Sequence, residues 1–418
     1  MKIDKFIMAA ANKKNVIEII RTKGPINKAE ISRMLGLSLP TVMKFTDELE
    51  ATGAVKVIGK AESNGGKCPE LLEFVSDAFY IVGVDVGRNS MKAIMMDLGG
   101  NIAGKVTVKT GDDVNPKMII ERLIELIKAV MRKSEIPSDK FLGMGIGMPG
   151  LLDTENGNVI FSPDFRWENV SLLEPIKKSF DLNQILINSN QAMAMGERWF
   201  GIGRQSDYFI CVNLGHGIGS AIIEKGETYH GSCGSSGEIG HMTLDKNGPV
   251  CECGNHGCLE ILASGNAIAL QAQKAVKNGE KSAMFEMSGG KINSIDAKIV
   301  FDAAREKDKT AERIITAAVE YIGIGIANCI NLLDPDMIII SGGMVNAGNI
   351  LLEQLIPVIK ERQMKFAGRN VKIKVGELGE NATPMGAAAV ILSQYINAGC
   401  NGKSIYSTHF KDNSFYKS

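Results

Sequence analysis

Two similar hydrophobic hairpins, far apart in the chain, constrain its fold more than any other feature. The segment at 80–100, YIVGVDVGRNSMKAIMMDLGG, predicts a strand, a glycine turn and a second strand, and the segment at 208–227, YFICVNLGHGIGSAIIEKGE, predicts the same order. Any two hydrophobic hairpins look alike, but this match includes a tyrosine, a glycine and the polar residue two positions before that glycine. The matched pairs are Tyr80 with Tyr208, Val84 with Val212, Asp85 with Asn213, Gly87 with Gly215, Ala93 with Ala221 and Ile94 with Ile222. Such self-similarity predicts two related α/β lobes.

Strands and helices alternate between and after the hairpins. The apolar pattern predicts helices at 116–133, 311–333 and 382–395, strands at 141–147 and 337–340, and a strand at 185–188 followed by a helix through residue 199. This alternation predicts an α/β fold with an open mixed sheet in each lobe. The expected boundaries are a first lobe at 76–190, completed by a C-terminal helix at 382–398, a second lobe at 191–381 and a loose polar tail at 399–418.

Residues 1–75 differ from the rest of the chain and predict a separate N-terminal domain. They carry 12 basic against 9 acidic residues, whereas the whole chain has 47 of each. Any binding of nucleic acid must therefore come from a local basic patch. Helical periodicity in this region is followed by two expected strands, at 54–58 and 71–75, around the turn-like segment SNGGKCP.

Within this domain, residues 26–45 have the pattern of a helix-turn-helix. A first helix is interrupted at Gly36, and Ser38 is the expected N-cap of a second helix that has Pro40 in its first turn. The second helix is expected to bury three apolar side chains, those of Val42, Phe45 and Leu49. The alternative is a small helical domain for protein contact.

The outward side of that second helix predicts DNA contacts. Thr41 and Lys44 lie near its N-terminal end, which is the end that a recognition helix inserts into the major groove. Lys67, at the tip of the following hairpin, would reach the DNA backbone or minor groove as part of a wing. The candidate DNA-binding residues are Ser38, Thr41, Lys44 and Lys67.

Three cysteines crowd into one short loop and predict a metal site. Cys251, Cys253 and Cys258 lie within eight residues, and in a reducing compartment such crowding indicates metal binding rather than disulfides. Three thiolates with one imidazole favour tetrahedral zinc, and a closed shell of four protein ligands predicts a structural ion. The fourth ligand is His256, inside the loop, or His241, ten residues before Cys251. Spacing alone does not decide between them.

Several motifs resemble those of the ROK family of repressors, open reading frames and sugar kinases, and the resemblance covers nearly the whole chain. The motifs are the helix-turn-helix, GIGMPG at 145–150, the glycine turn at 215–219, Glu238-Ile239-Gly240-His241, and Cys251-x-Cys253-Gly254-x-x-Gly257-Cys258-x-Glu260. The resemblance implies a two-lobed actin-like ATPase (ribonuclease H-like) fold behind the winged helix-turn-helix. That winged helix is typical of the family's xylose, glucose and N-acetylglucosamine repressors.

The same resemblance implies a ligand set and a sugar site. It selects His241 as the fourth zinc ligand and implies that His241 and Glu238 face a sugar. Glu238 and Glu260 would accept hydrogen bonds from sugar hydroxyls, and Asn188 would both donate and accept them. A polyol needs convergent polar groups of this kind.

Two positions of this chain depart from the pattern of the family's kinases. Kinases that this chain resembles have Asn-Asp-x-Asn at the strand end, with the Asp as general base, but this chain has Ser189 in the Asp position. A serine hydroxyl needs its own base near neutral pH, and loss of a general base lowers rates by about 10²–10⁴-fold. The turn of the first hairpin, which binds phosphate in the kinases that this chain resembles and usually has a glycine there, has Arg88 instead.

Together these features predict a sugar-responsive transcriptional repressor rather than an enzyme. Its expected partners are operator DNA, a monosaccharide effector held in a kinase-like cleft, and further copies of the chain in a homodimer or tetramer. A phosphotransfer-system protein is an alternative effector. The N-terminus lacks a signal-peptide pattern, and the apolar run at 321–333 is interrupted by two asparagines. We therefore expect a cytoplasmic protein without a membrane partner. The rival prediction is an ATP-dependent sugar kinase with a fused DNA-binding domain.

Overall fold

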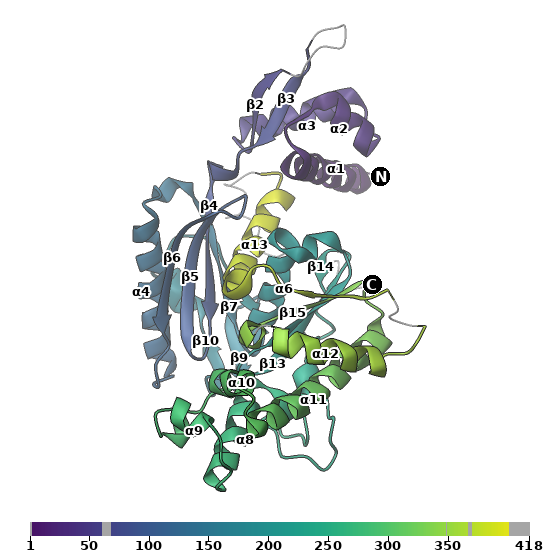
Figure 1. Cartoon of the computed structure of the whole chain (residues 1–418). Helices are drawn as coiled ribbons and strands as arrows, with labels where there is room; N and C mark the ends of the chain where they lie inside the picture. The colour runs from purple at the N-terminus through teal and green to yellow at the C-terminus, as the bar shows by residue number, and fades with distance from the viewer. Residues whose placement is uncertain (1, 61–67, 348, 367–369, 401–418) are drawn as a thin grey trace. The chain divides into compact units, whose positions relative to one another are not determined.

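The first predicted hairpin forms the middle of a five-stranded sheet with the order β11-β7-β4-β5-β6 (Figure 1). Strand β4 (Tyr80–Val86) pairs antiparallel with β5 (Ser90–Asp97) and parallel with β7 (Phe141–Met148). The remaining strands of this sheet are β6 (Ile102–Lys109) and β11 (Gln184–Asn188). Strands β4, β5 and β7 are almost entirely buried, and for this reason their sequences are nearly continuous runs of apolar residues.

The second hairpin forms a sheet of the same design, with the order β14-β13-β12-β15-β16. Strand β12 (Phe209–Leu214) pairs antiparallel with β13 (Ile218–Glu224) and parallel with β15 (Met337–Ser341). The other strands are β14 (Glu227–Thr228) and β16 (Lys372–Val375). The repeated pairing pattern confirms the predicted α/β class with a mixed sheet in each lobe.

The computed structural model describes residues 2–60, 68–347, 349–366 and 370–400. Internal contacts divide the chain into two units. The first unit comprises residues 1–148, 152–187 and 387–418, and the second comprises residues 149–151 and 188–386. The N-terminal domain thus belongs with the first sheet, and the predicted metal loop with the second.

The N-terminal domain is a winged helix built around a three-stranded sheet of order β1-β3-β2. Its elements are α1 (Lys2–Lys23), β1 (Ile26–Asn27), α2 (Lys28–Leu35), α3 (Leu39–Ala51), β2 (Val55–Lys60) and β3 (Glu70–Phe74). Asn27 and Glu30 form a capping box at the start of α2, and Gly36 ends that helix with a left-handed φ of 64° that favours glycine. The predicted inward side chains Val42, Phe45 and Leu49 are buried.

The rest of the first unit packs around its sheet. Helix α4 (Pro116–Ser134) covers one face of the sheet, as Figure 1 shows, and buries Ile119, Leu123, Ile127 and Val130 among other apolar side chains. Its apolar stripe at i, i+4 spacing explains why its bounds were predictable. The structure adds an unpredicted three-stranded sheet and a short helix, namely β8 (Leu151–Asp153), β9 (Asn158–Ser162), β10 (Trp167–Ser171) and α5 (Leu173–Lys177).

The second unit has a largely helical core next to its sheet. Its helices are α6 (Ser189–Phe200), α7 (Leu259–Ala263), α8 (Gly265–Lys277), α9 (Met284–Met287), α10 (Ala297–Arg305), α11 (Lys309–Leu333) and α12 (Asn349–Arg362). Helix α11 is long and apolar enough, by length and composition alone, to cross a membrane. Most of its apolar stretch is instead buried in the core of this unit, against α7, α8, α10 and α12.

Helix α13 (Ala382–Asn397) begins in the second unit and ends in the first. Within the second unit its first turns pack against α6 at glycines on both helices, Gly196 and Gly386. Within the first unit its Tyr395 ring meets Phe79 edge-on, with ring centroids 5.6 Å apart. The predicted loose tail starts at 399, but Cys400 is buried, and residues 401–418 lie outside the described part of the chain.

Short 3-10 helices connect several of these elements. They are η1 (Ser76–Ala78), η2 (Ser138–Lys140), η3 (Ile202–Gln205), η4 (Ile239–His241), η5 (Ile292–Ser294), η6 (Gly343–Ala347) and η7 (Gly379–Asn381).

Candidate metal centre and ligand-binding residues

The predicted metal loop brings four side chains together in the second unit. The ligand atoms of His241, Cys251, Cys253 and Cys258 all lie within 4.8 Å of one another. Sγ of Cys253 is 3.7 Å from Sγ of Cys258, and Sγ of Cys251 is 3.7 Å from Nδ1 of His241. His256 does not join this cluster and is exposed.

Backbone geometry holds the loop in this shape. The amide of Cys251 donates to the carbonyl of Asn255 at 2.7 Å, and the amides of Leu244 and Asp245 both donate to the carbonyl of Gly257. Gly257 has a φ of 57°, and a Cβ there would lie 1.7 Å from the carbonyl oxygen of Asp245. Only glycine therefore fits at this position.

The donor set and its spacing fit a zinc ion. Tetrahedral coordination with Zn–S bonds of about 2.3 Å separates two sulfurs by about 3.8 Å, close to the observed Cys253–Cys258 separation. Burial, together with the neighbouring thiols, raises the pKa of Cys258 to about 12. A metal ion binds these cysteines as thiolates, and zinc supplies the positive charge that compensates them when bound.

The predicted sugar residues Glu238 and Glu260 lie next to this cluster. Oε2 of Glu238 is 4.0 Å from Nε2 of His241, whereas the Cys251 sulfur is near the other ring nitrogen, Nδ1. The Glu238 side chain is 47% exposed; partial burial and the charge of Glu260 raise its pKa, and His241 opposes that shift. Oε2 of Glu260 accepts the amide of Ile218 at 2.8 Å, which ties α7 to the glycine turn of the second hairpin.

Asn188 and Ser189 lie at the start of α6. Oδ1 of Asn188 caps the helix by accepting the amides of Asn190 and Gln191, and its Nδ2 donates to the carbonyl of Gly150 at 3.0 Å. Ser189 is the first residue of the helix and is partly buried. Nε2 of Gln191 donates to the carbonyl of Gly234 at 3.4 Å, linking this end of α6 to the loop that precedes Glu238.

In the other unit, Asp85 lies near the end of β4 and Arg88 in the turn of the first hairpin. Nη1 of Arg88 donates to the carbonyl of Gly111 at 3.1 Å. Burial raises the pKa of Asp85 to about 6, and the positive charge of Lys92, its register partner on β5, opposes the shift. Asp85 on β4 is thus paired across the two strands with Lys92 on β5, whose side chain is buried.

The helix-turn-helix presents a surface that differs in detail from the prediction. Ser38 is the N-cap of α3, and its Oγ lies 2.7 Å from Oγ1 of Thr41, so these two hydroxyls engage each other. Lys44 is exposed, whereas Lys67 lies outside the described residues. Sequence reasoning missed two exposed apolar side chains on the same helix, those of Leu39 and Met43. Their i, i+4 spacing, outside the buried stripe, is the signal that marks them.

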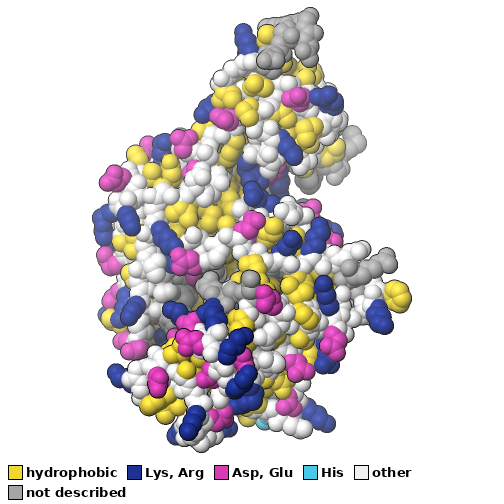
Figure 2. Space-filling view, in the orientation of Figure 1, with side chains coloured by type: hydrophobic (Ala, Val, Ile, Leu, Met, Phe, Trp, Pro, Cys, Tyr) yellow, Lys and Arg dark blue, Asp and Glu magenta, His cyan; other side chains and the backbone are white. Residues whose placement is uncertain are grey.

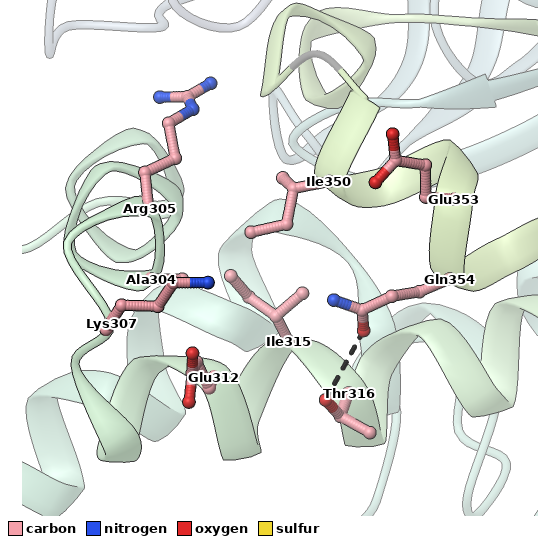
Figure 3. Close-up of a pocket in the computed structure, with 9 residues that line it drawn as sticks. All are labelled: Ala304, Arg305, Lys307, Glu312, Ile315, Thr316, Ile350, Glu353 and Gln354. Carbon is pink, nitrogen blue, oxygen red and sulfur yellow. Dashed lines mark hydrogen bonds between the residues drawn. The ribbon is translucent and has the colours of Figure 1, made fainter.

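A separate pocket of about 510 Å³ lies in the second unit, away from every predicted site residue (Figure 3). Ile315 and Ile350 point toward each other at its centre, and Thr316 donates to Gln354 at 3.4 Å. Its rim carries charges of both signs, from Arg305, Lys307, Glu312 and Glu353. This mixture selects no single class of ligand.

Known proteins resemble this chain over nearly its full length. It is 32% identical to a xylose repressor of Caldicellulosiruptor bescii over 394 residues, which are 94% of this chain and 98% of the repressor. It is also 34% identical to a glucokinase of Thermotoga maritima over 312 residues, which are 74% of this chain and 96% of the kinase.

Among solved structures, a ROK family transcriptional regulator, described as a homolog of the Escherichia coli MLC protein, superposes with a TM-score of 0.81 at 26% identity. The match covers 96% of this chain and 100% of that one. The pattern of a winged helix-turn-helix DNA-binding domain matches residues 11–56, and that of the ROK family matches residues 81–394. The chain belongs to the ROK family and has the winged-helix organisation of its transcriptional regulators.

Proposed function

We propose that this protein is a sugar-responsive transcriptional repressor that binds operator DNA through its winged helix. The observation that carries the proposal is the end-to-end likeness to a xylose repressor, with a DNA-binding domain at the N-terminus. The glucokinase likeness spans almost all of that kinase but only 74% of this chain. The glucokinase match therefore leaves about a quarter of this chain without a kinase counterpart.

On the DNA side, we expect a homodimer or tetramer to place two α3 helices on the half-sites of a palindrome. Ser38, Thr41 and Lys44 are the proposed contacts on α3, and Lys67 is a proposed contact from the wing. A repressor of this kind works on the nucleoid, which is consistent with a cytoplasmic protein.

On the effector side, we propose a monosaccharide held by Asn188, Glu238, His241 and Glu260. The proposed zinc ion is structural: bound to Nδ1 of His241, it would fix the orientation of the imidazole and leave Nε2 toward Glu238. Sugar binding lowers affinity for DNA only if the sugar binds the DNA-free form more tightly.

The proposed repressor does not phosphorylate its sugar. Ser189 occupies the position at which the related kinases have their general base, and a hydroxyl is a poor base near neutral pH. A sugar kinase with a fused DNA-binding domain is the second candidate, favoured by the 34% identity to a glucokinase.

Three measurements test the proposal on the full chain. A thermal-shift screen of monosaccharides, with xylose included because of the relative's name, should give a rise in Tm with one sugar, because a ligand of the native state stabilises it. Titration of that sugar into a protein–operator complex should release the DNA; tighter binding would identify a sugar-dependent corepressor system instead. Steady ADP release with ATP and any hexose or pentose would favour the kinase and contradict the role assigned to Ser189.

A further inference from the structure

The recognition helix α3 exposes two apolar side chains along one flank of its buried stripe. Leu39 is 44% exposed and Met43 is 45% exposed, whereas Val42 and Leu49 are fully buried. Because Leu39 and Met43 are four residues apart on one helix, they are neighbours on its surface. Figure 2 shows hydrophobic side chains among the charged ones on the surface of this domain.

The charges on α3 indicate which half of the helix approaches a polyanion. Its first turn contains no acidic residue, and Lys44 in the second turn is exposed. The C-terminal half carries Asp47, Glu48 and Glu50, whose carboxylates are ion-paired with Lys13 and Lys28, so this half offers phosphates no unpaired positive charge. The N-terminal half, with Leu39 and Met43, is therefore the part that is electrostatically compatible with a DNA groove.

DNA offers few partners to an apolar side chain. In the major groove every base edge presents donors or acceptors, and the apolar group on view there is the C5-methyl of thymine. A flexible thioether such as that of Met43 adapts to irregular apolar contacts. Thr41, the polar alternative nearby, has its hydroxyl engaged with Ser38.

We propose that Leu39 and Met43 read thymine methyl groups, and so select A·T pairs within each operator half-site. The inference rests on the proposed operator binding by α3. Lys44 anchors the helix to phosphate and contributes affinity without sequence preference. Leu39 and Met43 contribute little affinity to random DNA, because random sequence seldom places a methyl under either side chain.

The experiment removes single methyl groups from the DNA. An operator is first enriched from a random duplex pool with the full-length protein. Each thymine of the enriched half-site is then replaced by deoxyuridine, which keeps the hydrogen-bonding edge and lacks only the methyl. The wild type should lose affinity about fourfold at each contacted position. Leu39→Ala and Met43→Ala should each bind the thymine operator with similarly reduced affinity. At the thymine that the removed side chain contacted, replacement by deoxyuridine should cause no further loss of affinity.

Two controls make the outcome specific. Met8→Ala removes an exposed methionine from α1 of the same domain, and should keep the wild-type dependence on thymine. Lys44→Ala should weaken binding to thymine and deoxyuridine operators equally and reduce the salt dependence. Because Leu39 and Met43 are exposed, both alanine variants should melt at the wild-type temperature.

The failures are distinguishable. Suppose that an operator is enriched but that deoxyuridine does not change the affinity of the wild type, or lowers the affinity of the wild type and of both alanine variants equally. Methyl reading by Leu39 and Met43 is then wrong, while the proposed operator binding stands. Unchanged operator affinity in both alanine variants would show that the two side chains do not contribute to DNA binding, and would equally overturn the inference. If no sequence is enriched, both the proposed operator binding and the inference built on it fail.

Discussion

Nδ1 of His241 lies 3.7 Å from the sulfur of Cys251, and its other ring nitrogen lies 4.0 Å from the carboxylate of Glu238. One imidazole thus joins the thiol cluster to the proposed sugar residues. An ion bound to the cluster would therefore influence how Glu238 is presented to a ligand, although Glu238 itself is not in the cluster.

The two histidines of the loop should differ in their effect on zinc. His241→Ala should lose stoichiometric zinc and lower the Tm, because three thiolates without the imidazole leave the shell open. His256→Ala is the matched control, since His256 is exposed and outside the cluster, and it should retain one zinc per chain. Metal content by mass spectrometry and melting by circular dichroism check both. Zinc retained in His241→Ala at wild-type stoichiometry would contradict the ligand set.

Glu238 should contribute to sugar affinity without contributing much to stability. Glu238→Ala removes a partly exposed acceptor, and loss of a hydrogen bond to a charged group should weaken monosaccharide binding roughly tenfold or more. Calorimetric titration with the sugar that raises the Tm measures the change. Glu252→Ala, at an exposed glutamate of the metal loop, should bind the sugar like the wild type. Equal affinity in both variants would remove Glu238 from the site.

Asp85 should make the protein less stable as the pH rises through the mildly acidic range. Burial raises its folded pKa to about 6, so the folded state holds the proton more tightly than the unfolded state does. The free energy of unfolding should therefore fall between about pH 4 and pH 6, by up to about 3 kcal/mol from this group. Asp85→Asn should flatten this part of the profile, measured by denaturant unfolding. Asp112→Asn, at an exposed position, should keep the wild-type slope, and a slope that survives in Asp85→Asn would refute the assignment.

Gly386 should tolerate no side chain. A Cβ on this residue of α13 would lie 1.6 Å from the carbonyl oxygen of Ala192 on α6. Gly386→Ala must push the two helices apart, and we expect a loss of about 2–4 kcal/mol in unfolding free energy. At Gly343 nothing lies within 4 Å of the Cβ position, so Gly343→Ala should stay close to the wild type. Similar denaturation midpoints for the two variants would show that the helices have room to separate.

Local patterns predicted much of the fold. The strands at 141–147 and 337–340 and the helix at 116–133 agree within two residues with β7, β15 and α4. The small sheet of β8, β9 and β10 was not predicted, because its short strands mix exposed and buried positions without a regular alternation. The exposure of Leu39 and Met43 was not predicted either, because it depends on which residues of α3 the rest of the domain covers.

The sequence by itself determined the class of fold, the winged helix and the three cysteines of the metal loop, since apolar periodicity, turn residues and thiol spacing act over a few neighbouring residues. Cysteine spacing left two histidines open and the family resemblance implied His241; the tertiary structure brings His241 to the thiols, because η4 and the loop at 251–258 meet through backbone contacts around Gly257 and Thr243. It also decided that the Thr41 hydroxyl engages Ser38 and that Lys92 lies beside Asp85. Such pairings depend on distances in space, which spacing along the chain does not encode.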